Sequence, residues 1–128
     1  MQLLLDTCCW LWWLSEPSKL NMGQFEAITN CQNQLFLSTA SIWEIGIKVN
    51  RKKLTIPQPI NKLVEKQCPI DNIVILDIKP HHAIKVGELE LHHKDPFDRI
   101  IIAQAICEDL TVITSDKIFQ KYDVALIS

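Results

Sequence analysis

The sequence is short of glycine, with only three in 128 residues (Gly23, Gly46 and Gly87). They are too far apart to form the glycine-rich phosphate loops of the Walker A or G-x-G-x-x-G type, so nucleotide-binding enzymes that depend on those loops are excluded. The chain also lacks an excess of basic charge, because 13 Lys and Arg face 15 Asp and Glu. Any nucleic-acid binding must therefore come from a local group of cations and not from the field of the whole protein.

Paired cysteines and long apolar runs are missing as well. The five cysteines are odd in number and never in C-x-x-C spacing, which argues against a disulfide scaffold or zinc ribbon and favours buried free thiols. No apolar run reaches the roughly 18 residues needed to cross a bilayer. The apolar start, Met1–Leu14, is not typical of a signal peptide, because it lacks a basic beginning and contains Asp6. We therefore expect a cytoplasmic protein without membrane contact.

The length and the 48% hydrophobic content predict one globular domain over residues 1–128. Short apolar segments alternate with helical patterns, which predicts an α/β fold with a mostly parallel sheet and helices on both faces. Strands are expected at Gln2–Leu5, Gln34–Ser38, Ile73–Ile78, Thr111–Thr114 and Val124–Ile127. Helices are expected at Cys8–Leu14, around Phe25 to near Asn30, from Ser41 to about Lys52, at Ile60–Gln67, from Pro80 to about Leu91, at Phe97–Glu108 and at Lys117–Gln120.

Acidic residues fall where these strands end. Asp6 follows the first strand, Glu44 lies one helical turn beyond the second and Asp116 follows the fourth, while Asp98 opens the helix that leads into the fourth. Ligands of parallel α/β sheets bind outside the carboxyl ends of the strands. Four carboxylates in one such crevice repel one another unless protons or a divalent cation neutralise them. Oxygen ligands suit Mg²⁺ or Mn²⁺ rather than zinc, and the chemistry that fits is metal-assisted hydrolysis of a phosphodiester.

Each acid has a structural alternative, and the alternatives differ in strength. Ser41 to Glu44 matches a capping box, and Asp95-Pro96 matches a helix N-cap with Asp98 in the first turn. Asp116 could be a turn residue. Asp6 has the weakest structural explanation, because nothing local requires a charge after that strand. Taken together, their positions favour the functional interpretation.

The chain resembles PIN domains, and it closely resembles the VapC-type toxin nucleases of bacterial toxin–antitoxin pairs. The matching segments are Leu3–Thr7 with Leu11-Trp12, Ser38–Ile45, His93–Ala105 and Leu110–Asp116. The resemblance implies a three-layer α/β/α sandwich and a Mg²⁺-dependent endoribonuclease whose metal ligands match Asp6, Glu44, Asp98 and Asp116. Asp95 belongs to the same motif and is assigned to capping or to support of the ligands. Many relatives carry His where this chain has Cys8, which leaves the role of that position open.

The resemblance also implies partners. Proteins of this kind are usually inhibited by a small antitoxin bound over the active-site crevice, and they usually form homodimers. The segment Cys8–Leu14 is apolar on every side, which suits either a helix buried between the sheet and a partner subunit or an ordinary core helix.

Several polar residues are candidates for supporting roles. Contacts with RNA phosphates are expected from Arg99 and from the run Arg51, Lys52 and Lys53, although surface lysines are often simply solvated. Thr7, Ser41 and Thr114 are candidates for hydrogen bonds to a ligand, a metal-bound water or a carboxylate, or for capping and turn bonds. We interpret the pairs His81-His82 and His92-His93 as surface or helix-terminus residues without a matching partner arrangement.

Two other functions compete with the ribonuclease. A phosphatase that forms an aspartyl phosphate also has an Asp after its first strand, but it generally needs a second Asp two residues later, where this chain has Cys8. A catalytically inactive PIN-like module that only binds protein or RNA is the main alternative. It would have no reason to keep four mutually repelling acids.

Overall fold

Five parallel strands form one sheet in the computed structural model, which describes residues 1–128. They lie in the order β3-β2-β1-β4-β5, and every pairing is parallel. The α/β class with a parallel sheet is therefore confirmed. The strands are β1 (Gln2–Leu5), β2 (Gln34–Ser38), β3 (Ile73–Leu76), β4 (Thr111–Ile113) and β5 (Leu126–Ile127).

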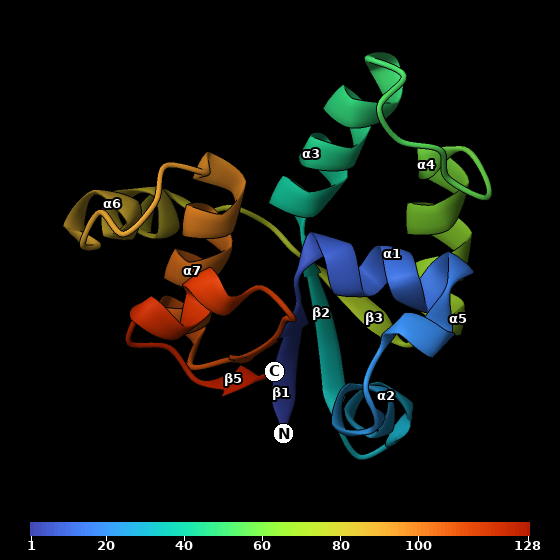
Figure 1. Ribbon diagram of the computed structural model, residues 1–128, viewed down its shortest axis with the longest axis horizontal. Helices are drawn as coiled ribbons and strands as arrows, with labels where there is room; N and C mark the ends of the chain where they lie inside the picture. Colours follow the sequence, from blue (N-terminus) through green and yellow to red (C-terminus); the bar gives the residue numbers. More distant parts are fainter.

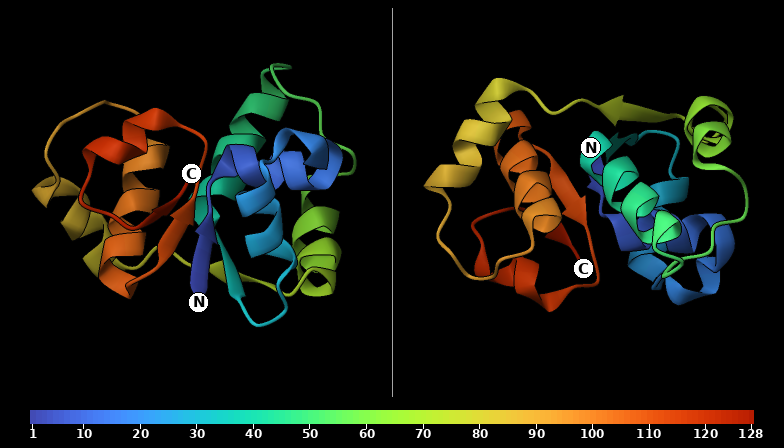
Figure 2. Two further views of the ribbon diagram at one scale, coloured as in Figure 1. Left: turned by 60° about the horizontal axis from the view of Figure 1, so that its bottom comes forward. Right: turned by 90° about the horizontal axis from the view of Figure 1, so that it is seen from above.

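Helices cover both faces of the sheet and give the expected three layers (Figures 1 and 2). The buried side chains beside β1 form two clusters, one on each face of the sheet, because successive side chains of a strand point to opposite faces. Leu3 and Leu5 belong to one buried cluster with Trp10, and Leu4 belongs to a second cluster with Ile102. The first cluster is covered by α1 (Thr7–Ser15), α2 (Met22–Thr29) and a helical segment over residues 60–70. This segment consists of α4 (Ile60–Lys62), a π-helical turn (Leu63–Gln67) and α5 (Cys68–Ile70). The second cluster is covered by α7 (Pro96–Glu108) and the 3₁₀ turn Lys117–Lys121.

Two further helices complete the layers. The helix α3 (Thr39–Asn50) follows β2 and contacts both α1 and α7, while α6 (Pro80–Glu88) packs on α7. Several elements are shorter than the sequence predicts: β3 ends at Leu76, β5 has only two residues, and α6 ends at Glu88. At the end of α6 the Arg99 side chain satisfies the carbonyl oxygens of Val86, Leu89 and Glu90.

The order of the strands places a crevice beside β1. The chain passes from β1 to β2 on one side, whereas β4 and β5 lie on the other side, so the direction of winding reverses between β1 and β4. Parallel sheets bind their ligands at such a switch point. The backbone holds the two strand ends together there, since the Asp6 N–H donates to the Ile113 carbonyl oxygen over 3.0 Å.

The cysteines and the apolar segments behave mostly as expected. All five thiols are free, but only Cys9 and Cys68 are buried, and Cys8 and Cys31 are exposed. None of the helices has the length and apolar character required to cross a membrane. The helix α1 is a core helix on one face, where Cys9 and Trp10 are buried, and it is half-exposed along Leu11–Leu14.

Candidate metal centre

Five carboxylates line a single pocket at the carboxyl ends of the strands. The pocket has a volume of about 410 Å³. Its acidic residues are Asp6, Glu44, Asp95, Asp98 and Asp116, and Lys48 is the cation among its lining residues. All four acids that the sequence predicted as metal ligands therefore face one space, including Asp98, whose direction depended on where α7 begins.

Asp6 is buried at the start of α1. One of its carboxylate oxygens, Oδ1, accepts the Cys9 N–H over 2.7 Å and so caps the helix. This corrects the expectation that no local structure calls for a charge at Asp6. Burial raises the pKa of Asp6, the Thr114 hydroxyl and the Cys9 amide lower it, and the Asp116 carboxylate raises it further.

Glu44 faces the pocket from the second turn of α3. The capping-box interpretation is wrong, because Ser38 is the N-cap of α3 and its hydroxyl accepts the Ala40 N–H over 3.0 Å. Glu44 is 7% exposed, and its Oε2 accepts a hydrogen bond from Lys48 Nζ at 2.7 Å. That hydrogen bond is the main cause of a raised pKa of Lys48, to which Asp95 and Asp98 add.

Asp98 lies in the first turn of α7, which Pro96 and its N-cap Asp95 begin. Asp95 Oδ1 accepts the N–H groups of Phe97 and Asp98, so the capping role expected for Asp95 is confirmed. Burial, and then the Asp95 carboxylate, raise the pKa of Asp98 to about 6, although a hydrogen bond from His93 opposes them. The two atoms of that bond, His93 Nε2 and Asp98 Oδ2, are 3.1 Å apart.

Asp116 is held by the segment that leaves β4. Its Oδ1 caps the following 3₁₀ turn through the Ile118 N–H, and its own N–H donates to the Thr114 hydroxyl over 3.0 Å. Thr114 therefore makes a turn bond and also interacts with the Asp6 carboxylate, so two of the alternatives that the sequence left open apply together. A buried glutamine missed by the sequence reasoning, Gln24, fixes this segment by donating to the Thr114 carbonyl oxygen and to Ser115 Oγ.

The other two supporting candidates, Thr7 and Ser41, are bonded to each other, and Thr7 lines the pocket. Thr7 Oγ1 donates to Ser41 Oγ over 2.8 Å, and both side chains are buried. This bond ties the first turn of α1 to α3, and with it Asp6 to Glu44. Cys8 also lines the pocket, and burial together with Asp6 raises the pKa of its thiol. A thiol that stays protonated is a poor nucleophile.

In three of the acids, one oxygen is held and the other is free. Glu44, Asp98 and Asp116 each use one carboxylate oxygen to accept a hydrogen bond from the protein, and the second oxygen accepts none. The free oxygens belong to side chains that line the pocket, and the pocket volume leaves room for water molecules between them. Mg²⁺ is bound through few carboxylates and keeps several waters, so this set of oxygen donors fits it.

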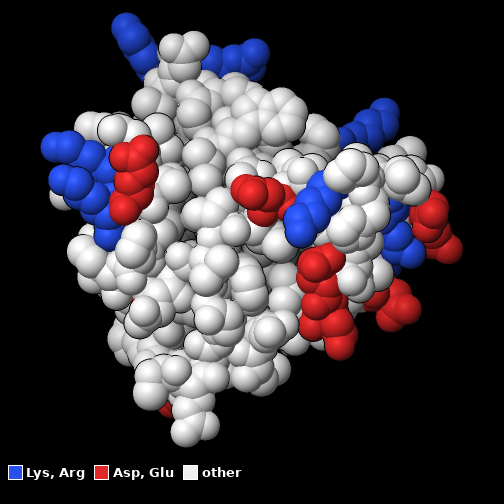
Figure 3. All heavy atoms as spheres, turned by 180° about the vertical axis from the view of Figure 1, so that it is seen from behind, with Lys and Arg blue, Asp and Glu red and all other residues white.

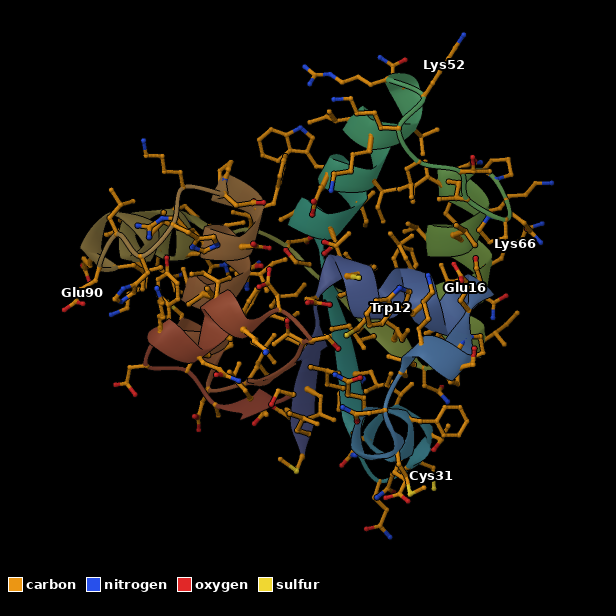
Figure 4. All side chains as sticks on the ribbon, viewed as in Figure 1. Trp12, Glu16, Cys31, Lys52, Lys66 and Glu90 are labelled. Atoms are coloured by element: carbon orange, nitrogen blue, oxygen red, sulfur yellow. The ribbon has the colours of Figure 1, made fainter.

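The predicted cationic contacts are placed differently. Arg99 is 8% exposed, and its guanidinium donates to the carbonyl oxygens of Val86, Leu89 and Glu90 and to the Tyr122 hydroxyl. This corrects the expectation of a phosphate contact at Arg99. Arg51, Lys52 and Lys53 are exposed beyond the end of α3, where Lys52 points away from the body of the molecule (Figure 4). None of these three residues lines the pocket, whereas Lys48 does.

The expectation of surface or helix-terminus histidines without a partner arrangement is corrected for His81, His82 and His93. His82 is fully buried, and His93 bonds to Asp98. His81, His82 and Glu108 bring ligand-type atoms within 4.8 Å of one another. His82 Nδ1, however, accepts the Lys79 N–H, so a neutral ring carries its proton on Nε2 and donates it to Glu108 Oε2. Since no lone pair is left on Nε2, hydrogen bonding accounts for this cluster without an ion.

Comparison with known proteins identifies the fold around the pocket. The family model for the PIN domain matches residues 3–125. The chain belongs to the PIN-domain family. A curated relative, Ribonuclease VapC22 of Mycobacterium tuberculosis, is 25% identical over 115 residues, which cover 89% of this chain and 86% of VapC22.

Solved structures support the same fold. The PIN domain described here is similar to DNA-bound VapBC from Salmonella typhimurium, with a TM-score of 0.71, 18% identity and coverage of 99% and 97% of the two chains. It is also similar to VapBC2 from Rickettsia felis bound to a promoter DNA fragment, with a TM-score of 0.70, 18% identity and coverage of 99% and 98%. FitAcB from Neisseria gonorrhoeae is a further neighbour, with a TM-score of 0.64, 21% identity and coverage of 98% and 96%.

Proposed function

We propose that this PIN domain is a Mg²⁺- or Mn²⁺-dependent endoribonuclease of the VapC type, the toxin of a toxin–antitoxin pair. The observation that carries the proposal is the meeting of Asp6, Glu44, Asp98 and Asp116 in one pocket at the switch point of the sheet. The similarity to Ribonuclease VapC22 supports the substrate class.

The electrostatics of the pocket favour a bound cation. Asp6 and Asp98 both have raised pKa values, and neighbouring carboxylates contribute to both. Repulsion among these carboxylates destabilises the folded protein, and a divalent ion that neutralises the carboxylates increases its stability. An inactive PIN-like module would not need that charge, which is why we favour the enzyme.

The chain's own residues would hold the reacting groups in place. Asp6, Glu44, Asp98 and Asp116 would bind the ion through their carboxylate oxygens. When bound, the ion lowers the pKa of a water molecule and stabilises charge on the phosphate. The bond between Thr7 and Ser41 would keep α1 and α3 at a fixed spacing, and Lys48, 51% exposed, would attract the RNA phosphate once Glu44 engages the ion.

The first test is metal binding by Glu44→Gln. We expect the affinity for Mg²⁺ or Mn²⁺ in a calorimetric titration to fall at least about tenfold, because a charged ligand is lost while the side chain keeps its length. The matched control is Glu88→Gln, which also removes a glutamate paired with a lysine of its own helix, here Lys85 at 3.6 Å. Equal affinities of wild type and Glu44→Gln would reduce Glu44 to a partner of Lys48 and oppose the proposal.

The exposed run Arg51, Lys52 and Lys53 is proposed to bind the RNA backbone beyond the pocket. On the face turned away from Figure 1, most Lys and Arg side chains lie close to Asp or Glu, and a wide area in the lower half of the view is almost uncharged (Figure 3). We find no continuous basic surface on that face, so local cations such as these would have to supply the attraction.

Replacing all three of these residues by Gln is expected to weaken the binding of single-stranded RNA and to make it less sensitive to salt. Each lost phosphate contact should reduce the slope of log K against log [salt] by about 0.7. Affinity for Mn²⁺ should stay unchanged, since these side chains do not line the pocket. The control is Lys62→Gln with Lys66→Gln, two exposed lysines on the 60–70 helical segment. A salt slope equal to that of wild type would remove the run from the RNA site.

Partner proteins are proposed from the apolar surface around the acids. Leu11, Trp12 and Leu54 form one wall of the pocket, and Leu11 and Trp12 are half-exposed. We propose that a small antitoxin covers this wall and the acids together, and that the chain forms a homodimer. The solved neighbours, which include VapBC, FitAB and a toxin–antitoxin complex from Klebsiella pneumoniae, support the antitoxin partner.

A further inference from the structure

His93 is bonded through both ring nitrogens, although it lies outside the pocket lining. Nε2 is 3.1 Å from Asp98 Oδ2, and Nδ1 is 2.8 Å from the Tyr122 hydroxyl. That hydroxyl also accepts a hydrogen bond from Arg99 Nη1 over 2.9 Å. Four side chains therefore form one continuous chain of hydrogen bonds, which ends at a candidate metal ligand.

The direction of this chain follows from its two ends. A guanidinium can only donate, so the Tyr122 oxygen accepts from Arg99 and its single hydrogen is left for His93 Nδ1. An ionised carboxylate can only accept, so His93 Nε2 must carry the hydrogen that faces Asp98. A neutral His93 therefore satisfies both ends in only one tautomer, the one with the proton on Nε2.

The guanidinium at the start of the chain is itself fixed. Arg99 is buried and also bonds to the carbonyl oxygens of Val86, Leu89 and Glu90, so it cannot turn away from Tyr122 without leaving those acceptors unpaired. Tyr122 is 7% exposed, and its ring lies against the rings of His92 and His93. The hydrogen-bond chain is thus anchored by two buried side chains, Arg99 and Tyr122.

We infer that His93 is a positioning residue for the metal site: its Nε2–H holds Asp98 Oδ2, and Asp98 Oδ1 is left as the oxygen that ligates the ion. Arg99 donates to the Tyr122 hydroxyl, which in turn donates to His93 Nδ1, and this favours the Nε2–H tautomer. This inference rests on the proposed function, because the orientation of Asp98 matters only if Asp98 binds a metal. Hydrogen-bond partners of this kind, behind a metal ligand, typically contribute 10- to 100-fold to metal affinity.

The test measures the Mn²⁺ affinity of two His93 variants by titration, starting from the metal-free protein. His93→Gln keeps an N–H donor near the position of Nε2, whereas His93→Leu keeps the bulk and removes the donor. We expect Mn²⁺ affinity to fall about tenfold or more in His93→Leu and to be largely restored in His93→Gln. His92→Leu is the matched control, because His92 packs on the same tyrosine ring without bonding to Asp98.

A second measurement is independent of folding of the variants. The ¹⁵N chemical shifts of His93 in the wild-type protein, taken at mildly alkaline pH where imidazoles are neutral, should identify the Nε2–H tautomer. The opposite tautomer, or a His93→Leu protein that folds and binds Mn²⁺ as wild type does, would overturn the inference. If wild type binds no Mn²⁺ at all, the proposed function fails, whereas the tautomer still reports on the hydrogen-bond chain.

Discussion

Asp6→Asn is expected to remove metal-dependent RNA cleavage and to leave the fold intact. The loss of one charged ligand should lower the cleavage rate at least about 100-fold, since a bound ion contributes several kcal/mol to transition-state stabilisation. Asn caps helices about as well as Asp, so the bond from the Cys9 N–H can persist. The free energy of unfolding without metal should stay the same or rise, because a buried charge with a raised pKa is removed.

The experiment follows cleavage of a fluorescent single-stranded RNA with and without Mn²⁺, and urea unfolding in the presence of a chelator. Asp123→Asn is the control, because Asp123 is exposed and lies outside the pocket lining. Cleavage by Asp6→Asn at the wild-type rate would refute the catalytic assignment. A large loss of stability would instead show that the Asp6 carboxylate stabilises the metal-free fold, because Asn preserves the helix cap.

The sequence predicted the parallel sheet and most of the acidic site for one physical reason. Short strands buried on both faces must be apolar throughout, so their ends are marked by the first polar residues, and parallel strands bring those ends to one edge. Asp6 and Asp116 could be placed in this way directly. Glu44 follows because α3 begins at the end of β2, and Asp98 follows because Pro96 marks the start of α7.

Other features depend on contacts that sequence spacing does not reveal. Arg99 looked like a phosphate ligand because it follows Asp98, but its acceptors come from the end of α6, which no local pattern connects to it. Tyr122 is separated from His93 by 29 residues and meets it only in the folded chain. Gln24 reaches the segment after β4 across 90 residues. Long polar side chains that bind distant backbone atoms therefore escaped prediction, whereas side chains at strand ends did not.

Asp98→Asn is expected to change how the stability of the metal-free protein depends on pH. The pKa of Asp98 is raised from its ordinary value of 3.8 to about 6 in the folded chain. Between these values the folded state binds the proton more readily than the unfolded state, so this group makes the protein less stable as the pH rises from about 4 to 6. Above pH 6 the penalty is complete and is on the order of 2 to 3 kcal/mol.

Urea unfolding with a chelator should therefore show Asp98→Asn to be more stable than wild type at pH 7, with the difference shrinking towards pH 4. Asp123→Asn, an exposed control, should follow the wild-type curve. Adding Mn²⁺ at pH 7 should reverse the order, because wild type gains free energy by binding the ion and Asp98→Asn gains much less. If Asp98→Asn were instead less stable at pH 7 without metal, the Asp98 carboxylate would be stabilising the metal-free fold. The proposal that a cation is needed to neutralise the pocket would then fail.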